Sequence, residues 1–260
     1  MTSRIFNQTS DTLNPTRLRS QHCLPARHCL ALHMIRLVLF DIDGTLIQTR
    51  GAGVKAFGRA CDMEFNLPNG TERLNFAGRT DTGLARELFL HNRIEPSPEN
   101  FRRFFDCYVF WLDYLLTQTK GEVCPGVWEF IRQLHALPKA PVLGLLTGNI
   151  RLGAEIKLRR FELWEIFQTG AFGDDHEDRN QIAAIARQRG NQLLNDSLRG
   201  DQILVVGDTR LDIQCARNIG ARTLAVATGT TKFEALQAHR PDRLVEDLSD
   251  VTAEEFWGNR

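Results

Sequence analysis

Residues 35–46 join a short apolar run to two aspartates, a glycine and a threonine. Asp41 and Asp43 are two residues apart in an extended chain, so their carboxylates face roughly the same side. Thr45 adds a hydroxyl and a backbone donor where an anion could rest, and the intervening glycine lets the backbone turn away. We interpret this combination as one part of a chemical site. A strand-end turn with solvated aspartates is the alternative interpretation.

Two later segments carry polar residues of the same kind. Residues 147–149 offer a hydroxyl, a permissive glycine and an amide ahead of an expected helix N-terminus, which suits a phosphate. Asp208 and Asp212 follow another expected strand, and their carboxylates can reach one point. Each segment alone is also ordinary: the first as turn and capping chemistry, and Asp212 as an acid that complements a helix dipole.

Buried strands must bring these three segments together. Residues 35–40 are nearly all apolar, which is typical of a strand covered on both faces. Further strands are expected at 142–146, 167–172, 203–206, 223–227 and 243–245, with helices between them at about 151–161, 178–189, 210–219 and 231–239. This alternation predicts an α/β fold with a doubly wound parallel sheet. Because ligands bind at the carboxyl ends of such strands, the polar segments should meet at one edge.

A helical segment interrupts the alternation after the first strand. Residues 51–53, Gly-Ala-Gly, have the composition of a flexible joint, and residues 54–121 are helical in pattern. Aromatic and leucine residues three and four apart mark one helix face, and Thr80 or Asp81 would cap another helix. We interpret these aromatic residues as core. The predicted domains are a helical cap at 51–121 and a core domain at 34–50 and 122–260.

Composition restricts the classes of function. Basic and acidic residues both number 32, so charge gives no reason to expect nucleic acid or an anionic membrane as the principal partner. No apolar run approaches the roughly 20 residues that span a bilayer. The six cysteines include no CxxC pair, which favours a reducing cytoplasm over a disulfide framework or a zinc site. We therefore expect a cytoplasmic monomer or homodimer.

Residues 1–33 differ from the rest of the chain, with four arginines, one acid and no clear period. Met34 stands immediately before the first expected strand. One interpretation is that natural translation starts there and that residues 1–33 are an upstream extension, expected to be disordered. The alternative is an organelle transit peptide, since arginine and serine with few acids is its composition.

The three polar segments together resemble the motifs of the haloacid dehalogenase (HAD) superfamily of phosphohydrolases. The order DxDGTL, Thr-Gly-Asn and GDTxxD matches, over about residues 34–245. The helical segment after the first motif looks like the small cap of that superfamily. Residues 76–81, Phe-Ala-Gly-Arg-Thr-Asp, are similar to the cap of its phosphoglycolate phosphatase branch. The resemblance implies a HAD-like Rossmannoid core and hydrolysis of a phosphate ester.

The resemblance also implies a role for each motif residue. Asp41 would attack phosphorus to give an aspartyl phosphate, and Asp43 would protonate the leaving oxygen and then activate water. Because a carboxylate and a phosphate repel each other, a cation is needed, and Mg²⁺ suits that need. Its ligands would be Asp41, the backbone carbonyl of Asp43 and Asp208, with support from Asp212. The transferred phosphoryl group would contact a set of donors from Thr45, Thr147, Gly148 and Asn149.

The sequence departs from the family pattern in two places. Members usually have a lysine, often followed by proline, between the second and last motifs, whereas residues 173–180 contain Arg179 and no proline. Arginine stays charged and can bind phosphate with two bonds, so we predict that Arg179 takes this catalytic position. Lys157, on the preceding helix, is the alternative. The second departure is Gly148, where an asparagine is common in this branch; Asn149 is expected to serve instead.

The cap would select the substrate by closing over the site. Arg79 could pair with a carboxylate on a small phosphorylated metabolite such as phosphoglycolate, and a salt bridge with a cap acid is the competing interpretation. A dehalogenase should lack the acid Asp43, so that activity is disfavoured. A phosphomutase, a pyrophosphatase and a non-catalytic binding module stay open as alternatives.

Overall fold

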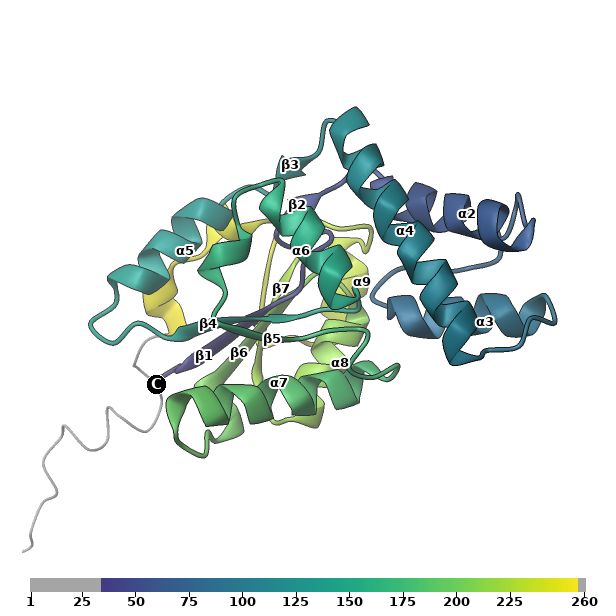
Figure 1. The fold of residues 1–260 in the computed structure, drawn as a ribbon. Coiled ribbons are helices and arrows are strands. Elements are labelled where there is room, and N and C mark those ends of the chain that lie inside the picture. Colours follow the sequence, from purple (N-terminus) through teal and green to yellow (C-terminus); the bar gives the residue numbers. More distant parts are fainter. Residues whose placement is uncertain (1–33, 257–260) are drawn as a thin grey trace, which may run out of the picture.

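The computed structural model describes residues 34–256, and a six-stranded sheet in the order β5-β4-β1-β6-β7-β8 forms its centre (Figure 1). Every neighbouring pair of strands in this sheet is parallel. The strands are β1 (Leu37–Phe40), β4 (Val142–Leu146), β5 (Thr169–Ala171), β6 (Ile203–Gly207), β7 (Arg222–Val226) and β8 (Arg243–Val245). The predicted leader at 1–33 lies outside the described residues.

Helices cover both faces of this sheet, which explains why its strands are apolar. One face carries α5 (Val127–Ala136) and α6 (Arg151–Arg159), and the other carries α7 (Arg179–Leu194) and α8 (Arg210–Asn218) (Figure 1). A short helix, α9 (Phe233–Ala238), contacts β8, and 3₁₀ turns lie at Trp164–Ile166, Gly200–Gln202, Leu248–Asp250 and Ala253–Phe256.

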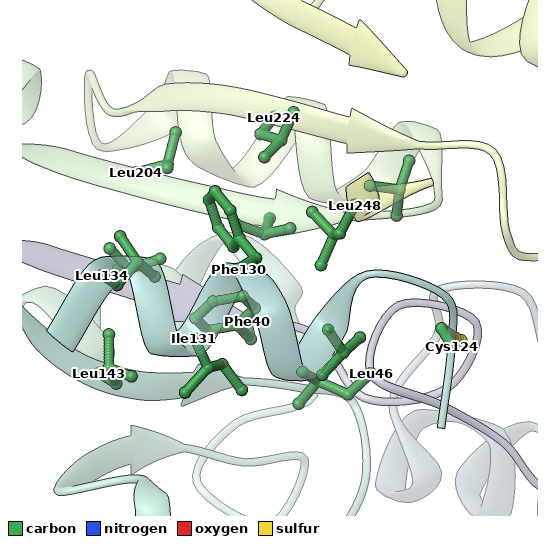
Figure 2. Packing of buried hydrophobic residues seen from close by; sticks show 14 of the residues in the cluster. Phe40, Leu46, Cys124, Phe130, Ile131, Leu134, Leu143, Leu204, Leu224 and Leu248 are labelled. Atoms are coloured by element: carbon green, nitrogen blue, oxygen red, sulfur yellow. The ribbon is translucent and has the colours of Figure 1, made fainter. Parts of the chain in front are cut away.

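Strand β1 is buried along its whole length because a hydrophobic cluster contacts each of its faces. On one face, Phe130, Ile131 and Leu134 of α5 pack against Phe40 (Figure 2). The ring centroids of Phe40 and Phe130 lie 6.4 Å apart in an edge-to-face arrangement. This packing fixes β1, and with it the position of the acidic residues that follow Phe40.

Three helices with a hydrophobic cluster of their own lie beside the sheet (Figure 1). A short antiparallel pair, β2 with β3, joins them to the sheet domain where the chain leaves and returns. Phe104 lies at the centre of the helical cluster, with ring centroids 4.6 Å from Phe57, 5.3 Å from Phe105 and 5.9 Å from Phe89. The elements are β2 (Ile47–Gln48), α2 (Ala52–Phe65), α3 (Asp81–His91), α4 (Pro98–Gln118) and β3 (Glu122–Val123).

Side-chain caps set the first residues of the helices that matter for the site. The Thr80 hydroxyl accepts a hydrogen bond from the Gly83 amide and begins α3. Thr209 and Asp212 exchange hydrogen bonds as a capping box and begin α8. The sequence therefore places Asp81 and Asp212 in the first turns of their helices.

The predicted fold class is confirmed: the sheet is parallel and doubly wound, and strands 142–146 and 243–245 have the predicted bounds. The prediction of a flexible joint at 51–53 is wrong, because Ala52 and Gly53 belong to the first turn of α2. The strand predicted at 167–172 is shorter, because Phe167 follows a 3₁₀ turn and only residues 169–171 pair with β4. The division into domains at residues 50 and 121 stays a prediction.

We expect Phe104→Ala to lower the free energy of unfolding by about 3–5 kcal/mol, because the ring is fully buried among other rings. Phe110→Ala is the matched control on the same helix, since its side chain is 66% exposed and its loss should cost about 0.5 kcal/mol or less. Urea denaturation measures both values. Equal losses for the two variants would contradict the proposed packing of the helical cluster.

Candidate active site

Three carboxylates from two adjacent strand ends meet at one edge of the sheet. Asp41 directly follows β1, Asp208 directly follows β6, and Asp212 lies in the first turn of α8. Strands β1 and β6 are neighbours in register, with Phe40 opposite Val206, so their carboxyl ends lie side by side. One oxygen of each carboxylate lies within 4.8 Å of the others, and all three side chains are buried. The structure thus brings together residues that are far apart in the sequence.

The turn after β1 is shaped to fit Asp208. Gly44 has a φ of +86°, a conformation that side-chain-bearing residues rarely adopt, and a Cβ atom there would lie 2.6 Å from Asp208 Oδ2. The Thr45 hydroxyl donates to Asp208 Oδ1 at 3.1 Å. The Gly-Thr pair after Asp43 therefore positions an acid more than 160 residues away, and Thr45 itself is buried beside the cluster.

Arg179 is the cation that lies within this cluster. Its Nη2 atom is 2.9 Å from Asp41 Oδ1 and 2.5 Å from Asp212 Oδ1. Nη2 also donates to the Leu146 carbonyl, and Nη1 donates to the Gly78 carbonyl, each at 3.2 Å. Burial acts to lower the pKa of Arg179, but Asp212 and Asp41 outweigh it and raise the pKa above its ordinary value. The guanidinium therefore remains charged and neutralises part of the cluster.

One arginine does not balance three buried carboxylates. The pKa of Asp41 is raised from 3.8 to about 6. Burial is the main cause and the charge of Asp212 adds to it, whereas Arg179 acts in the opposite direction. Burial also raises the pKa of Asp208 well above its ordinary value, with contributions from Asp41 and Asp212. Both shifts report unfavourable negative charge, which a further cation would relieve. Hard oxygen ligands of this kind suit Mg²⁺, so the residues present fit a magnesium ion.

A second polar network joins Lys157 to Asp43, Asn149 and Thr147. The Lys157 ammonium group is 2.6 Å from Asp43 Oδ2 and 2.5 Å from Asn149 Oδ1. The Asn149 amide nitrogen is 2.9 Å from Asp43 Oδ2 and 2.8 Å from Thr147 Oγ1. Asp43 is partly exposed, whereas Lys157, Asn149 and Thr147 are buried. Lys157 and Arg179 thus both belong to the site, each with a different aspartate.

A cavity of about 250 Å³ lies between this edge of the sheet and the inserted helices, and its lining includes the predicted site residues except Thr45 and Asp212. The opposite side is formed by the inserted segment, with Phe57 of α2, Tyr108 of α4 and Phe76 of the loop between α2 and α3 among its residues. Arg79 also lines the cavity, and its Nη1 atom is 2.5 Å from Glu87 Oε2. The salt bridge that competed with substrate binding in the sequence interpretation of Arg79 is therefore present.

Sequence reasoning missed two residues of this cavity. Asp81 was considered only as a helix cap and Tyr108 only as part of an apolar helix face, yet both line the cavity and are buried. Burial raises the pKa of Asp81 to about 6, opposed by Lys157. The position of Asp81 directly after the Gly-Arg-Thr segment was the available signal, since that segment already resembled a family cap. Tyr108 carried no signal, because its spacing is that of an ordinary buried face.

Comparisons with known proteins agree with this geometry. Among curated relatives, pyrophosphatase PpaX from Bacillus cereus (strain B4264) is 27% identical over 220 residues, which cover 84% of this chain and 94% of the relative. A predicted phosphoglycolate phosphatase from Haemophilus somnus has a TM-score of 0.65 at 21% identity, and the match covers 83% of this chain and 96% of that one. CbbY from Rhodobacter sphaeroides, solved in complex with phosphate, has a TM-score of 0.64 at 18% identity, covering 84% and 96%.

The two solved structures show likeness of fold, since their identity to this chain is low. The family itself is shown by a family model described as haloacid dehalogenase-like hydrolase, which matches residues 38–226. That range runs from β1 to β7 and includes all three acidic residues of the cluster as well as Lys157 and Arg179. The chain therefore belongs to the haloacid dehalogenase-like hydrolase family.

Proposed function

We propose that this protein is a magnesium-dependent phosphatase that hydrolyses a small phosphate monoester through an aspartyl-phosphate intermediate. The observation that carries the proposal is the position of Asp41: a buried carboxylate at the end of the central strand, within a cluster of acids, that lines the cavity beside the inserted helices. A nucleophile needs such a site, because its reactivity depends on exclusion of water and on neighbouring charges.

In the proposed reaction an oxygen of Asp41 forms a bond to phosphorus, and the bond from phosphorus to the ester oxygen breaks. Asp43 gives its proton to the leaving oxygen, then takes a proton from water, whose oxygen attacks the aspartyl phosphate and releases inorganic phosphate. The partial exposure of Asp43 supports this role, since it must meet both the leaving group and water. Lys157 and Asn149, bonded to Asp43, would hold its carboxylate in place.

The carboxylates of Asp41 and Asp208 and the backbone carbonyl of Asp43 would hold Mg²⁺, with Asp212 in support. When bound, the ion would neutralise charge on the carboxylates and on the phosphoryl oxygens. Arg179 would keep Asp41 and Asp212 in place from the opposite side of the cluster. Thr147 and the backbone amides of Gly148 and Asn149 would contact the transferred phosphoryl group. Thr45 is fully buried with its hydroxyl donated to Asp208, so it would position that aspartate instead.

A small carboxylated ester such as phosphoglycolate is the proposed substrate. The cavity is small, and Arg79, which lines it, belongs to the segment 76–81 that resembles the phosphoglycolate phosphatase branch. Although Glu87 occupies one nitrogen of Arg79, the guanidinium has further donors for a carboxylate. Inorganic pyrophosphate is the second candidate, because the curated relative at 27% identity is a pyrophosphatase.

Location in the cytoplasm and assembly as a monomer or homodimer stay predictions from the sequence. Within residues 34–256, no helix combines the length and the apolar character needed to cross a membrane.

We expect the wild-type protein to release phosphate from p-nitrophenyl phosphate with Mg²⁺ and to lose this activity with EDTA. Asp41→Asn should lower kcat by about 10⁴-fold or more, because it removes the nucleophile. Asp113→Asn, an exposed acid on α4, is the control and should leave kcat unchanged. Activity of the Asp41→Asn variant near the wild-type rate would rule out the proposed intermediate.

Magnesium should stabilise the protein more at pH 7.5 than at pH 5. The pKa of Asp41 without metal is about 6 in the folded state against an ordinary 3.8, so proton binding favours folding fully below about pH 4 and this stabilisation is lost as pH rises through 6. Mg²⁺ replaces the lost proton and adds about 2.7 kcal/mol at 100 times its Kd.

Thermal unfolding at both pH values, with and without Mg²⁺, measures this effect. Asp208→Asn should show a smaller magnesium shift, because it removes a ligand. A magnesium shift in wild-type protein that is the same at pH 5 and pH 7.5 would contradict the assignment of the ion to this cluster.

Arg79→Ala tests the proposed substrate. Loss of one charge-assisted hydrogen bond costs about 1.5–3 kcal/mol, so KM for phosphoglycolate should rise about tenfold or more. KM for ethyl phosphate, which lacks the carboxylate, should stay within about twofold of wild type, since Arg79 would not contact it. A panel that also contains pyrophosphate compares the two candidate substrates. Equal changes for phosphoglycolate and ethyl phosphate would exclude Arg79 as the carboxylate partner.

A further inference from the structure

The inserted helices contact the proposed phosphate-binding loop, residues 147–150, through backbone rather than through long side chains. A Cβ atom on Gly148 would lie 2.1 Å from the Arg79 carbonyl oxygen and 3.1 Å from the Thr80 Cα. No side chain fits at that distance, so glycine is required as long as the helical segment stays where it is. The departure from the family pattern at position 148 therefore has a local cause in this chain.

Asp81 makes two hydrogen bonds that bracket Asn149. Its backbone amide donates to the Gly148 carbonyl at 2.7 Å, and its Oδ2 atom accepts from the Ile150 amide at 2.9 Å. A third bond, from the Gly173 amide to the Asn149 carbonyl at 2.7 Å, holds the same residue from the core side. The backbone of Asn149 is thus fixed by partners on both sides, and one of those partners belongs to the inserted helices.

The orientation of Asn149 matters because its side chain connects the second polar network. It accepts from Lys157 and lies within hydrogen-bond distance of Asp43 and Thr147. A rotation of the loop would therefore move Asn149, which contacts the proposed acid–base residue Asp43. The same rotation would move the backbone amides proposed to bind the phosphoryl group. Asp81 contacts this loop through the Ile150 amide.

A purely local role for Asp81 does not account for these contacts. An acid in the first turn of a helix ordinarily faces solvent and interacts with the amides of its own helix. Here the Thr80 hydroxyl caps α3 and also donates to the Glu177 carbonyl at 2.9 Å, which anchors the helix start to the core. The Asp81 carboxylate is buried and accepts from the amide of Ile150, the residue directly before a different helix, α6.

We infer that Asp81 is a positioning residue that holds the phosphate-binding loop in its working shape. Docking of the inserted helices and ordering of the phosphate-binding loop are then coupled, because Asp81 takes part in both. The inference rests on the proposed phosphatase function and adds to it a residue that acts through Asn149.

The test compares Asp81→Ala with Asp81→Asn, which keeps an oxygen that can accept from Ile150. The readouts are kcat and KM for p-nitrophenyl phosphate, the inhibition constant of inorganic phosphate, and the melting temperature. Asp81→Ala should lower kcat and weaken phosphate inhibition by about tenfold each, the equivalent of one lost hydrogen bond. Asp81→Asn should restore both to within about threefold of wild type.

Arg86→Gln is the control for docking of the helices alone. Arg86 forms a salt bridge of 2.7 Å with Glu177 between α3 and the core, away from the phosphate-binding loop. This variant should lower the melting temperature slightly and leave phosphate inhibition within about twofold of wild type. Gly148→Ala is a second variant of the loop contact and should reproduce the loss seen for Asp81→Ala, so the test stands even if Asp81→Ala fails to fold.

Three results would overturn the inference while the wild-type protein is active: unchanged phosphate inhibition in folded Asp81→Ala, an Asp81→Asn variant as impaired as Asp81→Ala, or an equal loss in Arg86→Gln. Absence of phosphate release by the wild-type protein from every ester would instead refute the proposed function. The two failures are therefore distinguishable.

Discussion

The structure depends on the placement of three buried carboxylates at one edge of a parallel sheet. Asp41, Asp208 and Asp212 lie within 4.8 Å of one another, and each pair of like charges about 4 Å apart costs about 4 kcal/mol at an effective dielectric near 20. Arg179 contacts two of the three, and Asp208 is left with the Thr45 hydroxyl. A site built in this way favours binding of a cation, and the remaining residues hold the carboxylates in place until one arrives.

The two basic side chains divide the charges of the site between them. The sequence interpretation treated Arg179 and Lys157 as rivals for one position, because the family motif has one lysine there. In the structure Arg179 pairs with Asp41 and Asp212, whereas Lys157 pairs with Asp43. Replacement of the motif lysine by arginine is therefore accompanied by a lysine elsewhere, and the two cations contact different aspartates.

The sequence predicted the sheet and its three polar strand ends because both depend on local patterns: continuous apolar runs, and polar residues where those runs stop. It did not predict the short β2–β3 pair or the extent of β5, since two or three residues are too few to show a period. Asp81 was recognised only as a helix cap for a different reason. Its partner Ile150 is 69 residues away, and only the docking of α3 on the core brings the two together.

The docking of α3 on the core also explains why glycine occupies position 148 in the Thr-Gly-Asn motif. In the family pattern an asparagine often follows the motif threonine, and Gly148 would be read as the loss of a polar group. The backbone of Arg79 occupies the space that a side chain would need, and Asn149, one residue later, supplies the amide. A glycine at this position lets the helical segment approach the loop, and the approach in turn provides two hydrogen bonds that stiffen it. Loop rigidity in this chain is thus a tertiary property, which no motif read along the sequence could specify.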